Sequence, residues 1–101
     1  MTKMVKPLYR WELNKLMQGL MERGICFRFD TINNGGQITV LENDNKVWDA
    51  VCHDGSYGHT VGALEVMGTV IVTNTLDDVE GWLTADEILE RVDRMIMEAE
   101  N

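Results

Sequence analysis

The sequence predicts an α+β fold of two layers, in which an N-terminal helix and a C-terminal helix pack on an antiparallel sheet of three or four strands. Near both ends of the chain, apolar residues recur at spacings of three and four, as they do in amphipathic helices. Between these segments apolar and polar residues alternate, which is typical of strands. The 101 residues are expected to form one domain, 1–101, that is long enough to bury a core.

The first helix is expected over residues 8–23. Pro7 precedes it, and proline favours the first turn of a helix. Its apolar side consists of Leu13, Leu16, Met17, Leu20 and Met21. Gly24 is a typical helix stop, because glycine adopts the left-handed conformation found there. Trp11 lies beside the apolar side and is expected to be partly exposed.

Two alternating runs, 25–30 and 37–42, predict a β-hairpin. Asn-Gly is the strongest short hairpin signal, so the turn is expected at Asn34-Gly35. This turn would place Phe29 opposite Val40. One face of the hairpin, which we expect the helices to cover, then contains Ile25, Phe27, Phe29, Ile38 and Val40.

Two further strands are expected. Alternation predicts a third strand over 46–53, followed by a polar, glycine-rich loop over 54–62. A fourth strand is expected over 63–67, with a break or bulge at the glycine that follows it. Residues 79–83 are expected to lead into the final helix.

The final helix is predicted over 84–101, and its start is the best-defined local signal in the chain. Thr84 and Glu87 have the spacing of a capping box, in which each side chain bonds to the backbone N–H of the other residue. Leu83 and Ile88 have the spacing of a hydrophobic staple. The apolar stripe of this helix contains Ala85, Ile88, Leu89, Val92, Met95, Ile96 and Ala99.

Charge is unevenly distributed along the chain. Residues 1–28 carry six basic and two acidic side chains, a net charge of +4, whereas residues 29–101 carry a net charge of −12. Glu87 and Arg91 are expected to pair on the exposed side of the final helix. So acidic a surface repels nucleic acid and attracts a basic groove on another protein.

Composition excludes several classes of protein. The hydrophobic content of 45% and the charged content of 26% are those of a soluble globular domain. No apolar run approaches the ~20 residues that cross a membrane, and the N-terminus lacks the apolar core of a signal peptide. We therefore expect a cytoplasmic protein. Cys26 and Cys52 lack CxxC spacing and are expected to be buried, reduced thiols.

One loop contains residue types that occur in reactive sites, but their arrangement does not favour chemistry. Cys52 and His53 are neighbours on a strand, so their side chains point to opposite faces. His53 and His59 do not have the spacing of a zinc site. We expect no catalytic residue, no cofactor and no metal. A metal site in the 52–59 loop is the least favoured alternative.

The sequence GSYGHTVGALEVMG, residues 55–68, and the sequence DDVEGWLTADEILERV, residues 77–92, resemble a pattern in small acidic proteins of Firmicutes prophages and conjugative elements. The resemblance covers about the last half of the chain, and its motifs carry no catalytic residue. It implies an accessory protein of a mobile element. Accessory proteins of this kind include inhibitors of host defence, anti-CRISPR proteins among them.

These observations predict a non-enzymatic interaction module of a mobile element, an acidic inhibitor of a host nucleic-acid enzyme. The expected partner is a bacterial host protein with a basic groove, such as a CRISPR-associated nuclease, and neither nucleic acid nor a membrane is bound directly. The alternative is a small dimerising regulatory or assembly protein of a phage, acting as a homodimer. The candidate partner-binding residues are Tyr57, Asp77, Asp78, Glu80, Trp82, Asp86, Glu87, Glu90 and Asp93.

Overall fold

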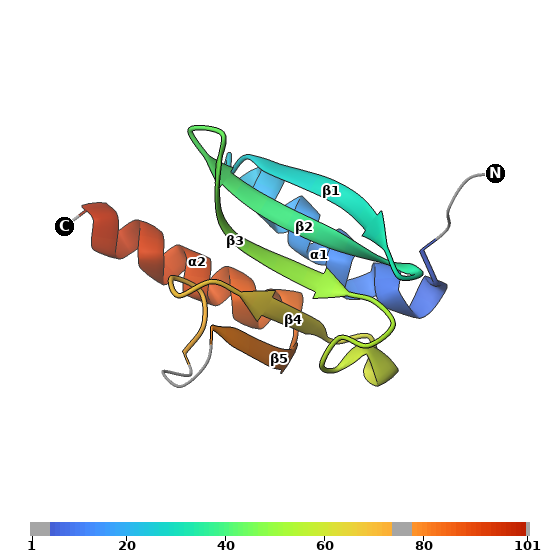
Figure 1. The fold of residues 1–101 in the computed structure, drawn as a ribbon. Coiled ribbons are helices and arrows are strands. Elements are labelled where there is room, and N and C mark those ends of the chain that lie inside the picture. Colours follow the sequence, from blue (N-terminus) through green and yellow to red (C-terminus); the bar gives the residue numbers. More distant parts are fainter. Residues whose placement is uncertain (1–4, 74–77, 101) are drawn as a thin grey trace.

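Two helices lie behind a five-stranded antiparallel sheet in the computed structural model, which describes residues 5–73 and 78–100 (Figure 1). The strands are ordered β1-β2-β3-β4-β5, so each strand pairs with its neighbour in sequence. This arrangement confirms the predicted two-layer α+β fold. The elements are α1 (Pro7–Glu22), β1 (Phe27–Ile32), β2 (Gly35–Glu42), β3 (Asn45–Cys52), the 3₁₀ helix η1 (His59–Val61), β4 (Leu64–Met67), β5 (Val79–Leu83) and α2 (Ala85–Glu100).

The sheet has one strand more than the three or four that the sequence predicts. The additional strand is β5, which pairs with β4 and places Leu83 opposite Leu64. Alternation does not reveal β5 because the strand contains Gly81 and a bulge. After Met67, β4 ends at Gly68, where φ is 132°.

The register predicted for the β1–β2 hairpin is wrong by two residues. Phe29 pairs with Ile38 and not with Val40. The turn consists of Asn33 and Asn34, whose φ angles of 45° and 62° are those of a two-residue hairpin loop. Because the register differs from the prediction by an even number of residues, every side chain stays on its predicted face of the sheet.

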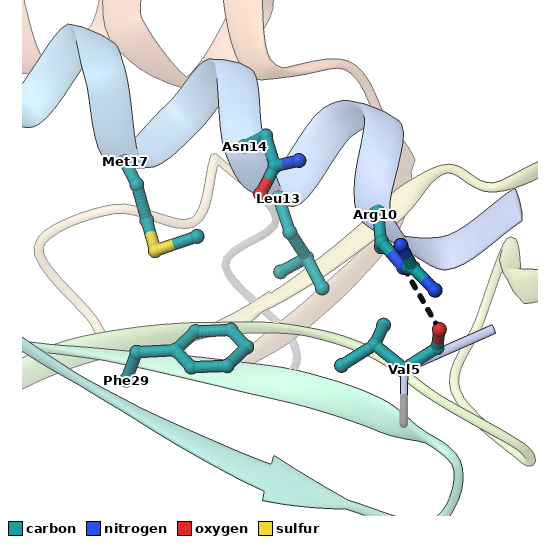
Figure 2. Close-up of a pocket in the computed structure, with 6 residues that line it drawn as sticks. All are labelled: Val5, Arg10, Leu13, Asn14, Met17 and Phe29. Carbon is teal, nitrogen blue, oxygen red and sulfur yellow. Dashed lines mark hydrogen bonds between the residues drawn. The ribbon is translucent and has the colours of Figure 1, made fainter. Parts of the chain in front are cut away.

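The two glycines at the start of β2 allow neighbouring elements to pack closely against this strand. A Cβ atom at Gly35 would overlap the carbonyl oxygen of Cys52 on β3. A Cβ atom at Gly36 would lie 2.5 Å from the ring of Phe29 and 3.0 Å from Leu13 of α1. Phe29 thus lies at the rim of the helix layer, beside Leu13 and Met17 (Figure 2).

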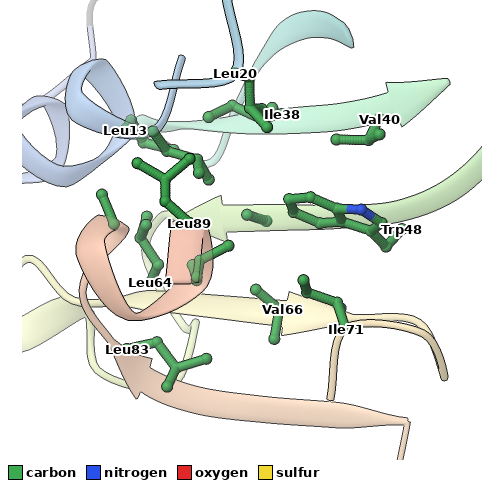
Figure 3. Packing of buried hydrophobic residues seen from close by; sticks show 14 of the residues in the cluster. Leu13, Leu20, Ile38, Val40, Trp48, Leu64, Val66, Ile71, Leu83 and Leu89 are labelled. Carbon is green, nitrogen blue, oxygen red and sulfur yellow. The ribbon is translucent and has the colours of Figure 1, made fainter. Parts of the chain in front are cut away.

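The core lies between the sheet and the helices, and Trp48 of β3 is its largest buried side chain. In Figure 3 its indole extends between Val40 of β2 and the pair formed by Val66 and Ile71. The predicted apolar stripes of both helices contribute to this core, except that Met21, Ile96 and Ala99, at the C-terminal ends of the stripes, are exposed. The fully buried residues on the helices include Leu13, Leu16, Leu20, Ile88 and Val92.

The capping box of α2 is confirmed. Thr84 N donates to Glu87 Oε1 over 3.0 Å, and Glu87 N donates to Thr84 Oγ1 over 3.2 Å. Arg91 instead pairs with Glu80 of β5, so the expected pairing of Arg91 with Glu87 is wrong. The cap therefore occupies Glu87, and Arg91 ties the helix to the neighbouring edge strand.

The two helices meet through two specific contacts. Gly19 of α1 packs on Leu89 of α2, and a Cβ atom at position 19 would overlap the leucine side chain. Glu12 Oε1 accepts a hydrogen bond of 2.7 Å from Ala85 N. The first N–H groups of a helix have no partner within the helix, so Glu12 satisfies one of these groups from the neighbouring helix.

Both cysteines are free, but their environments differ. Cys52 lies in the core, whereas Cys26 is exposed because it precedes the edge strand β1. The expectation that both thiols are buried is therefore wrong for Cys26. Burial raises the pKa of the Cys52 thiol to about 11, which leaves it protonated at neutral pH.

The contact of Gly19 with Leu89 predicts that Gly19→Val will destabilise the protein. The valine side chain has no space, and overpacking typically costs about 1–3 kcal/mol. Leu89→Ala creates that space, so the double variant should lose less stability than the sum of the two single losses. Urea denaturation of the four proteins measures this coupling. Strict additivity would contradict the contact.

Candidate functional site

Trp82 occupies a bulge in the edge strand β5. Leu64 pairs with Leu83 and Val66 pairs with Glu80, so β5 has one residue more than β4 over this interval. Trp82 has a φ of +62°, a left-handed conformation that is rare for a bulky side chain and that glycine usually occupies in bulges. At this bulge 61% of the residue is exposed.

Tyr57 lies beside Trp82. Trp82 N donates to the carbonyl oxygen of Tyr57 over 3.3 Å. Gly81 and Gly58 permit this approach, because a Cβ atom at Gly81 would overlap Tyr57 and one at Gly58 would lie 3.0 Å from Trp82 N. Tyr57 is 62% exposed. These two residues, which we call the aromatic pair, bring a large apolar surface into contact with solvent.

More apolar surface surrounds the loop that carries Tyr57. Val61 of η1 is 65% exposed, and Leu8 at the start of α1 is 50% exposed. Gly62 joins these two elements, because a Cβ atom there would lie 2.7 Å from the carbonyl oxygen of Leu8. Exposed apolar groups that occur together on a soluble protein are typical of contact surfaces.

The predicted acidic residues at the start of α2 form weak interactions within the chain. Asp86 lies 3.2 Å from Lys15 of α1, and Glu90 lies 3.5 Å from Arg94. The side chains of both pairs are largely exposed, and such pairs contribute only about 0–1 kcal/mol to stability. Glu87 is used in the capping box. Asp86 and Glu90 can therefore exchange their present partners for others at little cost.

Two other predicted acidic residues are held more firmly. Asp93 accepts hydrogen bonds of 2.7 and 2.9 Å from Arg23, which lower its pKa. Glu80 accepts bonds of 3.0 and 2.7 Å from Arg91 and another from Thr73 N. The bonds from Arg91 are the main cause that lowers the pKa of Glu80 to about 2. Both carboxylates connect structural elements.

The predicted site residues are thus only partly brought together. Tyr57 and Trp82 are neighbours, whereas the acidic residues follow β5 and α2 over a longer distance. Asp78 is exposed, and its carbonyl oxygen accepts a hydrogen bond from Gly68 N over 2.9 Å. Asp77 lies outside the described residues.

Sequence reasoning identified the polar loop after β3 but missed the contacts that Asp54 of this loop makes with distant residues. Asp54 accepts hydrogen bonds from Tyr9 Oη (2.6 Å), Lys6 Nζ (3.0 Å) and Asn34 Nδ2 (2.7 Å). These bonds hold the pKa of Asp54 well below its usual range, with Tyr9 as the largest cause. His59 Nδ1 lies 3.0 Å from Tyr9 Oη. Because the tyrosine proton is donated to Asp54, His59 must donate at this nitrogen.

This cluster, which we call the Asp54 clamp, ties the start of α1 to the β1–β2 turn and to the loop after β3. Cys52 does not take part, because its side chain belongs to the core. Within residues 5–73 and 78–100, no three His, Cys, Asp or Glu side chains come together as metal ligands. Through Asp54, the 52–59 loop is connected to α1 and to the β1–β2 turn.

Comparisons with models of protein families, with curated proteins and with solved structures gave no match. The helices of the described segments are too short or too polar to cross a membrane.

The Glu80–Arg91 pair predicts a pH-dependent contribution to stability. The pKa of Glu80 is about 2 in the folded protein, below its ordinary value of 4.5, so the stabilisation is complete above about pH 4.5 and is lost as the pH falls towards 2. Glu80→Gln should therefore cost about 2 kcal/mol at pH 7 and progressively less below pH 4.5.

Urea denaturation at pH 7 and pH 3 measures this difference. Glu90→Gln is the matched control, because Glu90 forms an exposed pair of 3.5 Å and its replacement should cost under about 0.5 kcal/mol at both pH values. Equal losses in the two variants would contradict a structural role for Glu80.

The left-handed conformation of Trp82 predicts that glycine suits this position better than alanine. Both Trp82→Gly and Trp82→Ala remove the indole, but only glycine adopts a φ of +62° without strain. We expect the glycine variant to be more stable by about 1 kcal/mol in urea denaturation. At Tyr57, whose φ is not positive, the order should be reversed. The same order at both positions would show that the bulge is not strained.

Proposed function

We propose that the protein is a non-enzymatic interaction module that inhibits a nucleic-acid enzyme by occupying a basic surface of that enzyme. The aromatic pair provides the anchor, and the carboxylates at the start of α2 provide the charge that a basic surface attracts. The partner chemistry is thus a positively charged groove with an apolar recess that accepts an indole.

The observation that carries this proposal is the exposure of Trp82 in a strained conformation. A bulky residue with positive φ costs about 1–3 kcal/mol, and such strain occurs preferentially at sites where it serves a function. Trp82 is 61% exposed, so the strain is not repaid by burial of the whole side chain. Tryptophan and tyrosine are also the residues that most often dominate the binding energy of protein interfaces.

Charge supports the choice of partner. The protein carries a net charge of −8, and Asp86 lies in the first turn of α2, close in sequence to Trp82. Its pair with Lys15 is exposed and weak, so a lysine or arginine of a partner can replace Lys15. A negative surface of this kind is attracted to the grooves in which enzymes hold nucleic acid.

The resemblance of residues 55–68 and 77–92 to proteins of mobile elements supports the biological setting. Tyr57 belongs to the first segment and Trp82 to the second, so the aromatic pair unites the two motifs. An inhibitor of host defence, of the anti-CRISPR type, is the form of the function that we propose. A CRISPR-associated nuclease has the basic groove that the charge requires.

The test is a binding experiment with a lysate of a Firmicutes host. The immobilised protein should retain a basic nucleic-acid enzyme. Raised salt should release this enzyme because it screens the attraction between the two proteins, and added DNA should release it because DNA binds the same basic residues. Addition of the protein should inhibit the purified enzyme. Trp82→Ala and Tyr57→Ala should each weaken binding at least tenfold, as expected for anchor residues.

Met21→Ala is the matched control, because Met21 is 63% exposed but lies at the far end of α1. It should bind and inhibit as the wild type does. Retention of the enzyme by Trp82→Ala with unchanged affinity would contradict the proposed surface. Binding without any loss of enzyme activity would contradict inhibition.

A further inference from the structure

Among residues 5–73 and 78–100, the outer side of β1 is an edge of the sheet that no helix or strand covers. β1 forms one end of the strand order, and Figure 1 shows no further element of these residues beyond it. All residues of β1 after Phe27 are exposed. Unpaired backbone groups at such an edge are a template for pairing with another strand.

The hydrogen-bond pattern shows which backbone groups point outward. Leu41 N donates to the carbonyl oxygen of Cys26 over 3.0 Å, so the backbone of Cys26 faces β2. The N–H and C=O groups of successive residues point to opposite sides of a strand. The backbone groups of Phe27, Phe29 and Thr31 therefore point away from β2, towards the open edge. The closing pair of the two-residue turn, Ile32 with Gly35, agrees with this alternation.

The charged side chains of β1 complement those of a second β1 that is turned by a twofold rotation about Phe29. Arg28 and Asp30 flank this residue, carry opposite charges and are 61% and 51% exposed. If a second β1 pairs antiparallel with Phe29 opposite Phe29, Arg28 of each copy lies opposite Asp30 of the other. Opposite charges in directly opposed positions stabilise a strand pair, and like charges destabilise it.

We propose that two copies of this chain associate through their β1 edges, antiparallel and with twofold symmetry about Phe29. The product is a continuous sheet that extends across both copies. The outward backbone groups of Phe27 in one copy then bond to those of Thr31 in the other, and the groups of the two Phe29 residues bond to each other.

Charge selects this register among those that the backbone permits. A shift by two residues keeps outward groups opposite outward groups, but it removes Arg28 from its position opposite Asp30. Arg28 Nε already lies 2.9 Å from Asp30 Oδ2 within one copy, and association provides each group with a second partner. Edge strands usually carry charge that prevents pairing, whereas this pattern permits one pairing.

An apolar contact accompanies the backbone pairing. Phe29 is 37% exposed and forms one wall of a pocket of about 310 Å³ between α1 and β1, together with Val5, Leu13 and Met17 (Figure 2). In the proposed register the two Phe29 side chains lie side by side on this face of the sheet. Association covers apolar surface that a single copy leaves exposed at the rim of its core.

This inference does not depend on the proposed function. β1 and β5 are opposite edges of the sheet, so association at β1 leaves the aromatic pair free on both copies. A strand of six residues provides a smaller contact area than a standard interface, which buries ~1,600 Å². We therefore expect the association to be weak and to depend on concentration.

Sedimentation equilibrium over a wide concentration range tests the proposal. The wild type should approach a dimer at high concentration. Arg28→Asp and Asp30→Arg should each lower the association constant at least tenfold, because each variant places like charges opposite each other in the dimer. The double variant R28D/D30R should recover association, since the exchange restores opposite charges across the symmetry axis.

Two further variants separate the edge from general effects of charge. Arg94→Asp makes the same charge change on exposed α2 and should leave association unchanged. Thr31→Pro removes an outward N–H group without removing a bond to β2, and it should abolish association while circular dichroism shows an intact fold. A strictly monomeric wild type, or a double variant no better than the single ones, would overturn the proposal.

Discussion

The position of α1 over β2 and β3 is the constraint on which the rest of the structure depends. Gly36 allows α1 to lie close to the sheet, and Gly19 allows α2 to lie close to α1. The helix layer is thereby centred on the middle strands, with Trp48 beneath it. The two outer strands receive less cover. Phe29 lies on one edge and is 37% exposed. Trp82 lies on the other edge, where it is 61% exposed at the bulge of β5.

Part of the uneven charge of the chain is used in ion pairs within the molecule. Lys15 and Arg23 of the basic N-terminal segment pair with Asp86 and Asp93 of the acidic segment. Both pairs therefore lie between the two helices, which the distribution of charge along the sequence does not reveal. The negative charge that a partner meets is therefore smaller on α2 than a count of its acidic residues suggests.

Local signals in the sequence were sufficient for much of the fold. The cap of α2 depends on two residues three positions apart, so its prediction needed no knowledge of tertiary structure. The turn of the first hairpin was misplaced because Asn34-Gly35 is a strong signal, while the glycines were needed for contacts with β3 and α1. Strand β5 was not predicted because its bulge interrupts the alternation of apolar and polar residues by which strands are recognised.

Contacts between distant segments explain what sequence reasoning did not find in the candidate site. Nothing local connects Tyr57 with Trp82 or Tyr9 with Asp54, and only the folded chain makes them neighbours. The choice of Tyr57 and Trp82 depended on residue type, and it did not foresee that they adjoin. The acidic candidates were chosen in the same way, and several of them proved to be partners of arginine or lysine.

The first hairpin turn also has a consequence for the chemical lifetime of the protein. An asparagine side chain loses ammonia most readily when glycine follows, because an unsubstituted neighbour does not hinder ring closure, and Asn34 precedes Gly35. The resulting carboxylate would replace the amide that now donates to Asp54 over 2.7 Å. Ageing of this one residue would thus convert an attraction into a repulsion at the point where the start of α1, the hairpin and the loop after β3 are joined.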